Sequence, residues 1–127
     1  MESTLEIGKK LVALCKQSHW LEAVDTLYSP DIVSIEAVEM APGRKRMEGI
    51  AAVREKTVRF LKDVDIHSCA VTGPWPHGDR FIVGFTLEHA PKNGPMAGKR
   101  VTIEEAALYT VKDGKIVKEE FFYTMPG

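Results

Sequence analysis

The chain has 127 residues, close to the commonest size of a single domain, and 44% of them are hydrophobic, which is typical of a globular protein. Seventeen basic residues against eighteen acidic ones give a formal net charge of −1. This balance argues against the dense cationic surface that nucleic acid or an anionic membrane would require, so we expect neither as a partner. We expect one domain over residues 1–127.

We find no pattern of a membrane-spanning or secretory segment in the sequence. No uncharged apolar run approaches the roughly 20 residues that a membrane-spanning helix needs. Charged residues interrupt residues 1–10, which therefore do not resemble a secretory signal. A cytoplasmic location is the resulting expectation. Cys15 and Cys69 lie far apart without metal-ligand spacing, and we expect both to be reduced and buried.

Two helices are predicted near the start of the chain. Ser3 and Glu6 have the spacing of a capping box, and apolar residues follow at near-helical intervals to about Gln17. Ser18 is predicted to cap a second helix. That helix should end near Tyr28, because a proline follows two residues later and disfavours helical geometry before it.

A short strand, Asp31–Val38, and a polar loop are predicted to precede a third helix. This helix, from Gly49 to Val64, has apolar residues at three- and four-residue spacing. Its predicted outer face carries Arg54, Glu55, Lys56 and Lys62.

Four strands are predicted in the second half: Ile66–Thr72, Arg80–His89, Arg100–Val111 and Lys115–Tyr123. Glycine, proline and aspartate at the junctions predict consecutive antiparallel hairpins. Helices first and strands afterwards indicate the α+β class. Strand 80–89 is apolar on both faces, so we expect a second copy of the chain to cover its outer face.

The order of these elements and several motifs resemble SnoaL-like proteins of the nuclear transport factor 2-like superfamily, over almost the whole chain. The motifs lie at Arg46–Ile50, Gly73–Phe81, Gly98–Thr102 and, above all, Asp113–Tyr123. The resemblance implies three N-terminal helices packed in the concave face of a curved sheet, which is mixed but mainly antiparallel. It also implies a cone with an internal pocket and homodimers formed through the sheet.

That superfamily includes ketosteroid isomerases, polyketide cyclases, epoxide hydrolases, dehydratases and proteins without catalytic activity. Because one fold serves so many purposes, the function has to be argued from the site.

Glu105 is the most informative position for a site. Its carboxylate interrupts a mostly apolar strand face formed by Val101, Ile103, Ala107, Tyr109 and Val111. A buried carboxylate needs hydrogen-bond donors, a wet cavity or a proton, and each of these is compatible with a pocket. The alternative is a structural carboxylate held by an arginine, a tyrosine hydroxyl or backbone groups.

A second acid is predicted from the next strand, in a register that depends on the turn. If Asp113–Gly114 forms a two-residue turn, Ala107 lies opposite Glu120, whereas a turn with a glycine bulge places Ala107 opposite Glu119. We favour Glu119, which should then lie diagonally beside Glu105. Two carboxylates in one apolar cup would raise one pKa and leave an acid and a base side by side.

Other side chains are candidates for the same pocket. Tyr109 and Tyr123 could donate to a developing oxyanion, although core packing is the alternative for both. Trp20 and Trp75 could form pocket walls, and His67 could contact a ligand or act as a base. No grouping has metal spacing, and there is no phosphate-binding or dinucleotide motif, so we expect no metal and no cofactor.

Two functions stay open at this point. The first is a cofactor-independent isomerase, cyclase, dehydratase or hydrolase acting on a small hydrophobic carbonyl or hydroxyl compound. Glu105 would be its acid–base residue, oriented by Glu119 and by Tyr109 or Tyr123. The second is a non-catalytic ligand-binding or accessory dimer. A protein-interaction module is a third reading, which would need an exposed apolar patch beyond the dimer surface.

Overall fold

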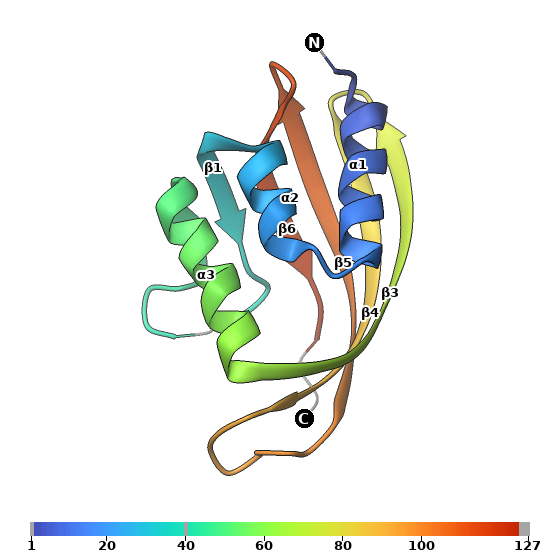
Figure 1. Ribbon diagram of the computed structural model, residues 1–127. Helices are drawn as coiled ribbons and strands as arrows, with labels where there is room; N and C mark the ends of the chain where they lie inside the picture. The colour runs from blue at the N-terminus through green and yellow to red at the C-terminus, as the bar shows by residue number, and fades with distance from the viewer. Residues whose placement is uncertain (1, 40, 125–127) are drawn as a thin grey trace.

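The computed structural model describes residues 2–39 and 41–124, in which helices lie on one face of a curved sheet (Figure 1). In chain order the elements are α1 (Thr4–Lys16), α2 (Trp20–Leu27), β1 (Tyr28–Ile35), β2 (Arg46–Glu48), α3 (Ile50–Asp63), β3 (Val64–His77), β4 (Arg80–Pro91), β5 (Val101–Lys112) and β6 (Lys115–Phe122). The strand order is β2-β1-β6-β5-β4-β3, and the neighbours are antiparallel except for β1 and β6, which are parallel. The predicted α+β class and mixed, mainly antiparallel sheet are confirmed.

The first helix begins as its sequence predicts, and the second does not. The Ser3 hydroxyl accepts a hydrogen bond from the Glu6 backbone N–H, and the Glu6 carboxylate accepts one from the Ser3 N–H. Ser18, by contrast, has φ 60° and donates its N–H to the Cys15 carbonyl. Because Ser18 belongs to the turn that ends α1, it cannot cap α2, whose N-cap is His19 without a side-chain cap bond.

One strand is shifted from its predicted position and another is longer. β1 starts at Tyr28 and ends at Ile35, three residues before the predicted end at Val38. β3 continues through Gly73–Pro74 to His77 instead of ending at Thr72. Proline lacks an N–H, but a register shift between Thr72 and Trp75 takes it out of the ladder, which resumes at Trp75 opposite Ile82. The three-residue strand β2 was predicted as loop, since a segment so short carries little periodicity.

The turn between β5 and β6 corrects the predicted register. Asp113 and Gly114 both have positive φ, and Lys112 pairs with Lys115, so the turn has two residues. The extra residue sits later, between the pairs 111–116 and 110–118. Ala107 therefore lies opposite Phe121, not Glu119 or Glu120. Glu119 lies opposite Tyr109 and is not diagonal to Glu105.

The core lies between the inner face of the sheet and the helices. Its most deeply buried side chains are Ile7, Leu11, Ile32, Val53, Phe81, Val83 and Ile116. Gly8 brings α1 close to β3, since a Cβ there would lie 2.9 Å from the Pro74 Cβ. Both cysteines are free; Cys15 is buried and Cys69 only partly so. In residues 2–39 and 41–124 no helix has the length and apolarity to span a bilayer.

Candidate functional site

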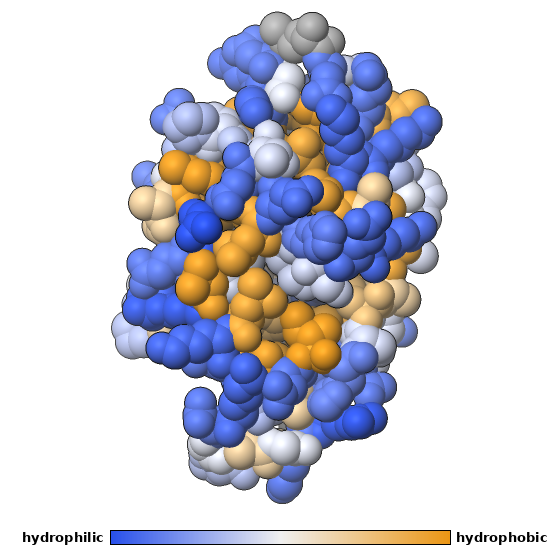
Figure 2. Space-filling model, in the orientation of Figure 1, coloured by the Kyte–Doolittle hydropathy of each residue, from blue (hydrophilic) through white to orange (hydrophobic). Residues whose placement is uncertain are grey.

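A cavity of about 490 Å³ lies between the three helices and the inner face of the sheet. Its wall is largely apolar and includes Leu11, Trp20, Val24, Phe60, Leu61, Val64, Ile66, Phe85, Leu87, Ile103 and Phe121. Figure 2 shows apolar residues gathered on this helix side of the molecule, around α3 and between it and the other two helices. This volume is in the size range of a small-molecule site.

Glu105 lies in this apolar cavity without a partner. It faces inward from the middle of β5, opposite Phe85 on β4, and its side chain is only partly exposed. Across the described part of the chain, no side chain or backbone group forms a hydrogen bond or ion pair with the Glu105 carboxylate. The Glu105 carboxyl group therefore faces the open space of the cavity.

The environment of Glu105 favours its protonated form. Burial, followed by the charge of Glu36, raises the pKa of Glu105 to about 7; Lys56 opposes the rise and Glu119 adds to it. A carboxyl group with such a pKa is present in both protonation states near neutral pH. It can therefore take a proton from a ligand or give one to it.

Glu119 is in the opposite situation, because its carboxylate is fully engaged. One oxygen accepts a hydrogen bond from the Tyr28 hydroxyl, and the other accepts one from the Ser34 hydroxyl at 2.8 Å and one from Lys56 Nζ at 3.3 Å. The residue is 2% exposed. A buried carboxylate with several donors is stable as an ion, so Glu119 can hold its neighbours in place and has little freedom to exchange protons.

Lys56 enters the cavity from α3, although its charge predicted an outer position. Its Nζ lies 2.6 Å from the Ser34 hydroxyl and 2.9 Å from a Glu36 oxygen, and it stands 4.7 Å from the centre of the Phe121 ring. Burial alone would lower the pKa of Lys56, but Glu119 and Glu36 outweigh it, and the pKa is raised. Lys56 is thus a permanent cation in this corner of the cavity.

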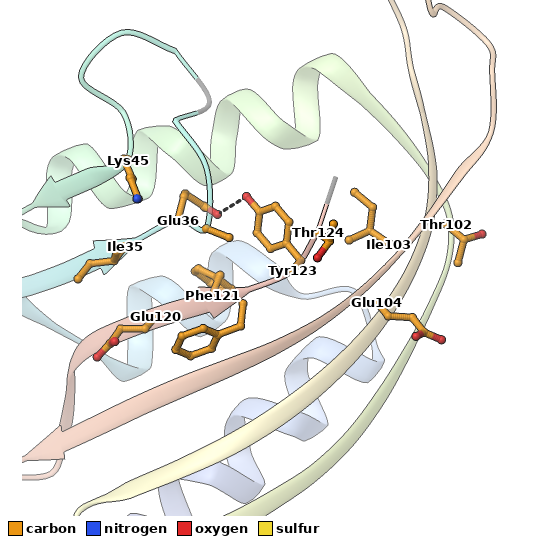
Figure 3. Close-up of a pocket in the computed structure, with 12 residues that line it drawn as sticks. Ile35, Glu36, Lys45, Thr102, Ile103, Glu104, Glu120, Phe121, Tyr123 and Thr124 are labelled. Carbon is orange, nitrogen blue, oxygen red and sulfur yellow. Dashed lines mark hydrogen bonds between the residues drawn. The ribbon is translucent and has the colours of Figure 1, made fainter. Parts of the chain in front are cut away.

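Glu36 and Tyr123 separate the cavity from an open groove of about 960 Å³. Figure 3 shows the two side chains facing each other, and the Tyr123 hydroxyl donates to the second Glu36 oxygen at 2.9 Å. Ile103 and Phe121 also border both spaces. The side chains of Glu36, Ile103, Phe121 and Tyr123 therefore lie where the cavity and the open groove adjoin.

Tyr109 lies at the inner end of the cavity, four positions along β5 from Glu105. It stacks on Phe81 with ring centres 5.0 Å apart and is 2% exposed. Burial, then the charge of Glu119, raises its pKa. Tyr109 therefore keeps its proton.

The structure brings most of the predicted site residues to the cavity, but not all. Glu105, Glu119, Tyr109, Tyr123 and Trp20 line it, and the Trp20 ring lies 6.2 Å from that of Phe85. The exposed side chains of Trp75 and His67 lie outside the cavity. Both project from β3, a strand that contributes only a few inward-facing side chains.

Sequence reasoning missed four members of the cluster: Tyr28, Ser34, Glu36 and Lys56. Tyr28 was predicted only as the end of the second helix, whereas its hydroxyl binds Glu119. The alternation along β1 contained a signal for Ser34 and Glu36, because both follow the fully buried Ile32 at two-residue steps. Lys56 lies three residues after the buried Val53, a spacing that places it on the inner stripe of α3. Within residues 2–39 and 41–124, no three His, Cys, Asp or Glu side chains are grouped to hold a metal ion.

Comparisons with known proteins agree on the architecture. The family model described as a SnoaL-like domain matches residues 2–123. A protein from Mesorhizobium loti, named for the SnoaL-like polyketide cyclases, is 35% identical, with a TM-score of 0.88 over 96% of this chain and 100% of its own. No curated protein matches the chain.

Two more distant structures share the fold alone. A nuclear transport factor 2-like protein from Burkholderia thailandensis is 20% identical, with a TM-score of 0.78 over 98% of this chain and 92% of its own. A protein of ketosteroid isomerase-like fold from Catenulispora acidiphila, in complex with trimethylamine, is 16% identical, with a TM-score of 0.69 over 90% of this chain and 82% of its own.

Proposed function

Since the chain belongs to the SnoaL-like domain family, we propose that it carries out cofactor-independent acid–base chemistry on a small hydrophobic carbonyl or hydroxyl compound. Glu105 is the group that exchanges the proton. The observation that carries this proposal is a carboxyl group without a partner, with its pKa raised to about 7, inside an apolar cavity of about 490 Å³. Proteins of this fold are named as cyclases and as an isomerase.

The surrounding residues fit supporting roles. A neutral ligand suits the cavity best, because the carboxylates of Glu36 and Glu119 both contact the Lys56 ammonium and would repel an anion. Trp20 and Phe85 offer aromatic surface beside Glu105 for a flat or alicyclic body. Glu119 orients Tyr28 and Lys56, and Tyr109 retains a hydroxyl proton that could face a developing oxyanion.

The test is solvent exchange at carbon. Wild-type protein is incubated in D₂O with a panel of small cyclic ketones and β-keto esters, and deuterium uptake next to the carbonyl is followed by NMR. We expect catalysed exchange in the wild type and in Glu104→Gln, which changes an exposed carboxylate on the opposite face of the same strand. Glu105→Gln should lose the catalysed rate. Equal exchange with Glu105→Gln would refute its role.

The second candidate is ligand binding without turnover, and a small amine is the ligand that one observation favours. An ammonium ion would pair with an ionised Glu105 and lie against the aromatic wall, an arrangement that stabilises buried cations. The neighbour from Catenulispora acidiphila was solved with trimethylamine. Titration with trimethylamine at pH 5 and pH 8 tests this, since binding should strengthen at pH 8, where Glu105 is ionised. Binding at pH 8 that is no stronger than at pH 5 would refute this second candidate.

We also propose that two copies associate through the outer face of the sheet. Trp75, Ile82 and Phe122 are 56%, 41% and 54% exposed and come from three different strands of that face. Trp75 and Ile82 lie directly opposite each other on neighbouring strands, and adjoining exposed apolar side chains are typical of an interaction surface. Analytical ultracentrifugation of the wild type and of Phe122→Lys tests the proposal: a dimer that becomes a monomer supports it, and a monomeric wild type refutes it.

A further inference from the structure

The ammonium group of Lys56 has no hydrogen-bond donor left for Glu105. An ammonium carries three N–H donors. Within hydrogen-bond distance of Nζ lie three acceptors, at 2.6 Å on Ser34, 2.9 Å on Glu36 and 3.3 Å on Glu119. The side chain is 19% exposed, so water contributes little to its solvation. The cation is held on the β1 and β6 side of the cavity by these three contacts.

Glu36 is the contact that can most readily be lost without undoing the rest. Glu119 is also bound by Tyr28, and Ser34 also donates to Glu119, so both belong to the buried cluster whether or not Lys56 is present. Glu36 lies just beyond the end of β1, with one oxygen on Lys56 and the other on the Tyr123 hydroxyl. Its carboxylate is thus fixed at both oxygens between the lysine and the last strand.

Glu105 shares the cavity with these groups, and in the described part of the chain its carboxyl forms no hydrogen bond or ion pair. The charged and titratable groups that face it or line the same cavity are Glu36 after β1, Lys56, Arg59 and Asp63 on α3, Glu119 on β6 and Tyr123 after it, Tyr109 on β5, His89 on β4, Cys69 on β3, Cys15 on α1, Tyr28 on β1, and Arg44 before β2. Arg44 and Arg59 both contact Glu55, at 3.8 and 2.9 Å. Lys56 is therefore the cation with the strongest influence on Glu105.

We propose that Glu36 is a positioning residue: by retaining the Lys56 ammonium on the β1 side of the cavity, it keeps Glu105 free of an ion pair and available for proton transfer. This inference rests on the proposed role of Glu105 and adds a specific cause for it. Without the Glu36 carboxylate, Lys56 loses an anionic acceptor. Glu105 lines the same cavity and its pKa responds to the charge of Lys56, so its carboxylate can take that place. An ion-paired Glu105 would be a poor base near neutral pH.

The test measures the titration of Glu105 directly and needs no ligand. Carboxyl carbons are labelled with ¹³C, and the Glu105 signal, assigned with Glu105→Gln, is followed from pH 4 to pH 9. In Glu36→Gln we expect the Glu105 pKa to fall by about 1 to 3 pH units, as for a carboxylate that gains a cationic partner. Glu48→Gln, an exposed carboxylate on β2 that contacts Arg46, is the control and should leave the titration unchanged.

A double-mutant cycle separates lysine capture from simple loss of negative charge, because the charge of Glu36 itself raises the Glu105 pKa. The effect of Glu36→Gln on that pKa is therefore measured both in the wild type and in Lys56→Met, which has no ammonium to capture, and we expect the larger fall in the wild type. An equal fall in the two backgrounds would overturn the proposal, and so would an unchanged pKa in a folded Glu36→Gln. If Glu36→Gln does not fold, Tyr123→Phe provides the second test, because it loosens one end of Glu36 and should lower the Glu105 pKa to a smaller extent.

The titration test of Glu36 and the deuterium-exchange test of the proposed function can succeed or fail independently. A Glu105 signal that titrates near pH 7 and responds to Glu36→Gln supports the positioning role even if no ketone exchanges deuterium. Conversely, exchange that depends on Glu105 but has the same pH profile in Glu36→Gln as in the wild type would leave the function standing and refute the role of Glu36.

Discussion

Replacing Glu105 with glutamine should change the stability of the protein in a way that depends on pH. Glutamine resembles the protonated carboxyl group and does not titrate. The pKa of Glu105 is raised from its ordinary value of 4.5 to about 7 in the folded state. Between these two values the unfolded chain has lost the proton while the folded protein still holds it, so the stabilising effect of that proton is present below 4.5 and lost as the pH rises through 7.

The size of the effect follows from the shift. One pH unit of difference between the folded and unfolded pKa corresponds to about 1.4 kcal/mol, so a rise from 4.5 to about 7 corresponds to about 3 kcal/mol. Wild type and Glu105→Gln should therefore have similar free energies of unfolding at pH 4.5. At pH 8 and above the variant should be more stable by about 3 kcal/mol. The other titrating groups affect both proteins and cancel in the difference.

Urea unfolding followed by far-ultraviolet circular dichroism at pH 4.5, 5.5, 6.5, 7.5 and 8.5 measures this difference. Glu104→Gln is the matched control, because it removes an exposed carboxylate from the adjacent position on the outer face and should show no such pH dependence. Two results would refute the reasoning. The free-energy curves of wild type and Glu105→Gln could run parallel over the whole range, or the variant could be the less stable protein at pH 8.5. Parallel curves would mean that the pKa of Glu105 is the same in the folded and unfolded protein, and a less stable variant at pH 8.5 would mean that the folded protein stabilises the Glu105 anion.

Three further predictions concern the residues around the site. Glu119→Gln should lower the free energy of unfolding by about 3 kcal/mol, because Lys56 and Tyr28 lose a buried anionic partner; Glu120→Gln, next to it and bound to Lys118, should change it by less than about 1 kcal/mol. Gly8→Ala should cost about 1 to 2 kcal/mol despite the higher helix propensity of alanine, since its Cβ would lie 2.9 Å from Pro74; a gain in thermal midpoint would contradict the close packing of α1 on β3. Burial raises the pKa of Cys15 to about 12 and that of Cys69 to about 11 from an ordinary 9.0; iodoacetamide at pH 8 should label the folded protein about 100-fold more slowly than the urea-unfolded chain, and equal rates would show that the thiols are exposed.

The sequence was sufficient for the parts of the fold that repeat regularly. The Ser3 capping box identifies the start of α1, the stripe along α3 identifies that element as a helix, and the alternation along β4 and β5 identifies both strands and their buried faces. The prediction errors occur where a single local interaction decides where a helix begins or how two strands pair. Ser18 has the right side chain for a cap but lies in the turn that ends α1, and the bulge in β6 cannot be read from a strand whose side chains would alternate in either register.

The site was predictable only in part, for a related reason. Alternation along β5 is enough to turn Glu105 inward, because its neighbours two residues away, Ile103 and Ala107, are apolar. The face of Glu119 was predicted correctly from an incorrect register, since the predicted and observed pairings differ by two residues and so preserve the alternation. Lys56 was predicted outside because lysine is rarely buried. Its inward position depends on acceptors from β1 and β6, which only the tertiary structure brings together.

The contrast between Glu105 and Glu119 follows from where the donors are. Glu119 lies where β1, β6 and α3 meet, and its carboxylate accepts hydrogen bonds there from Tyr28, Ser34 and Lys56. Glu105 lies further along the sheet, beside aromatic side chains that offer no such donors. A protein selected for stability alone would place an apolar residue at position 105, since an unpaired carboxyl weakens the fold at neutral pH. The carboxyl that lowers stability lies inside a cavity and not at the surface. This is the physical reason for proposing that Glu105 reacts with a ligand and that Glu119 supports the site.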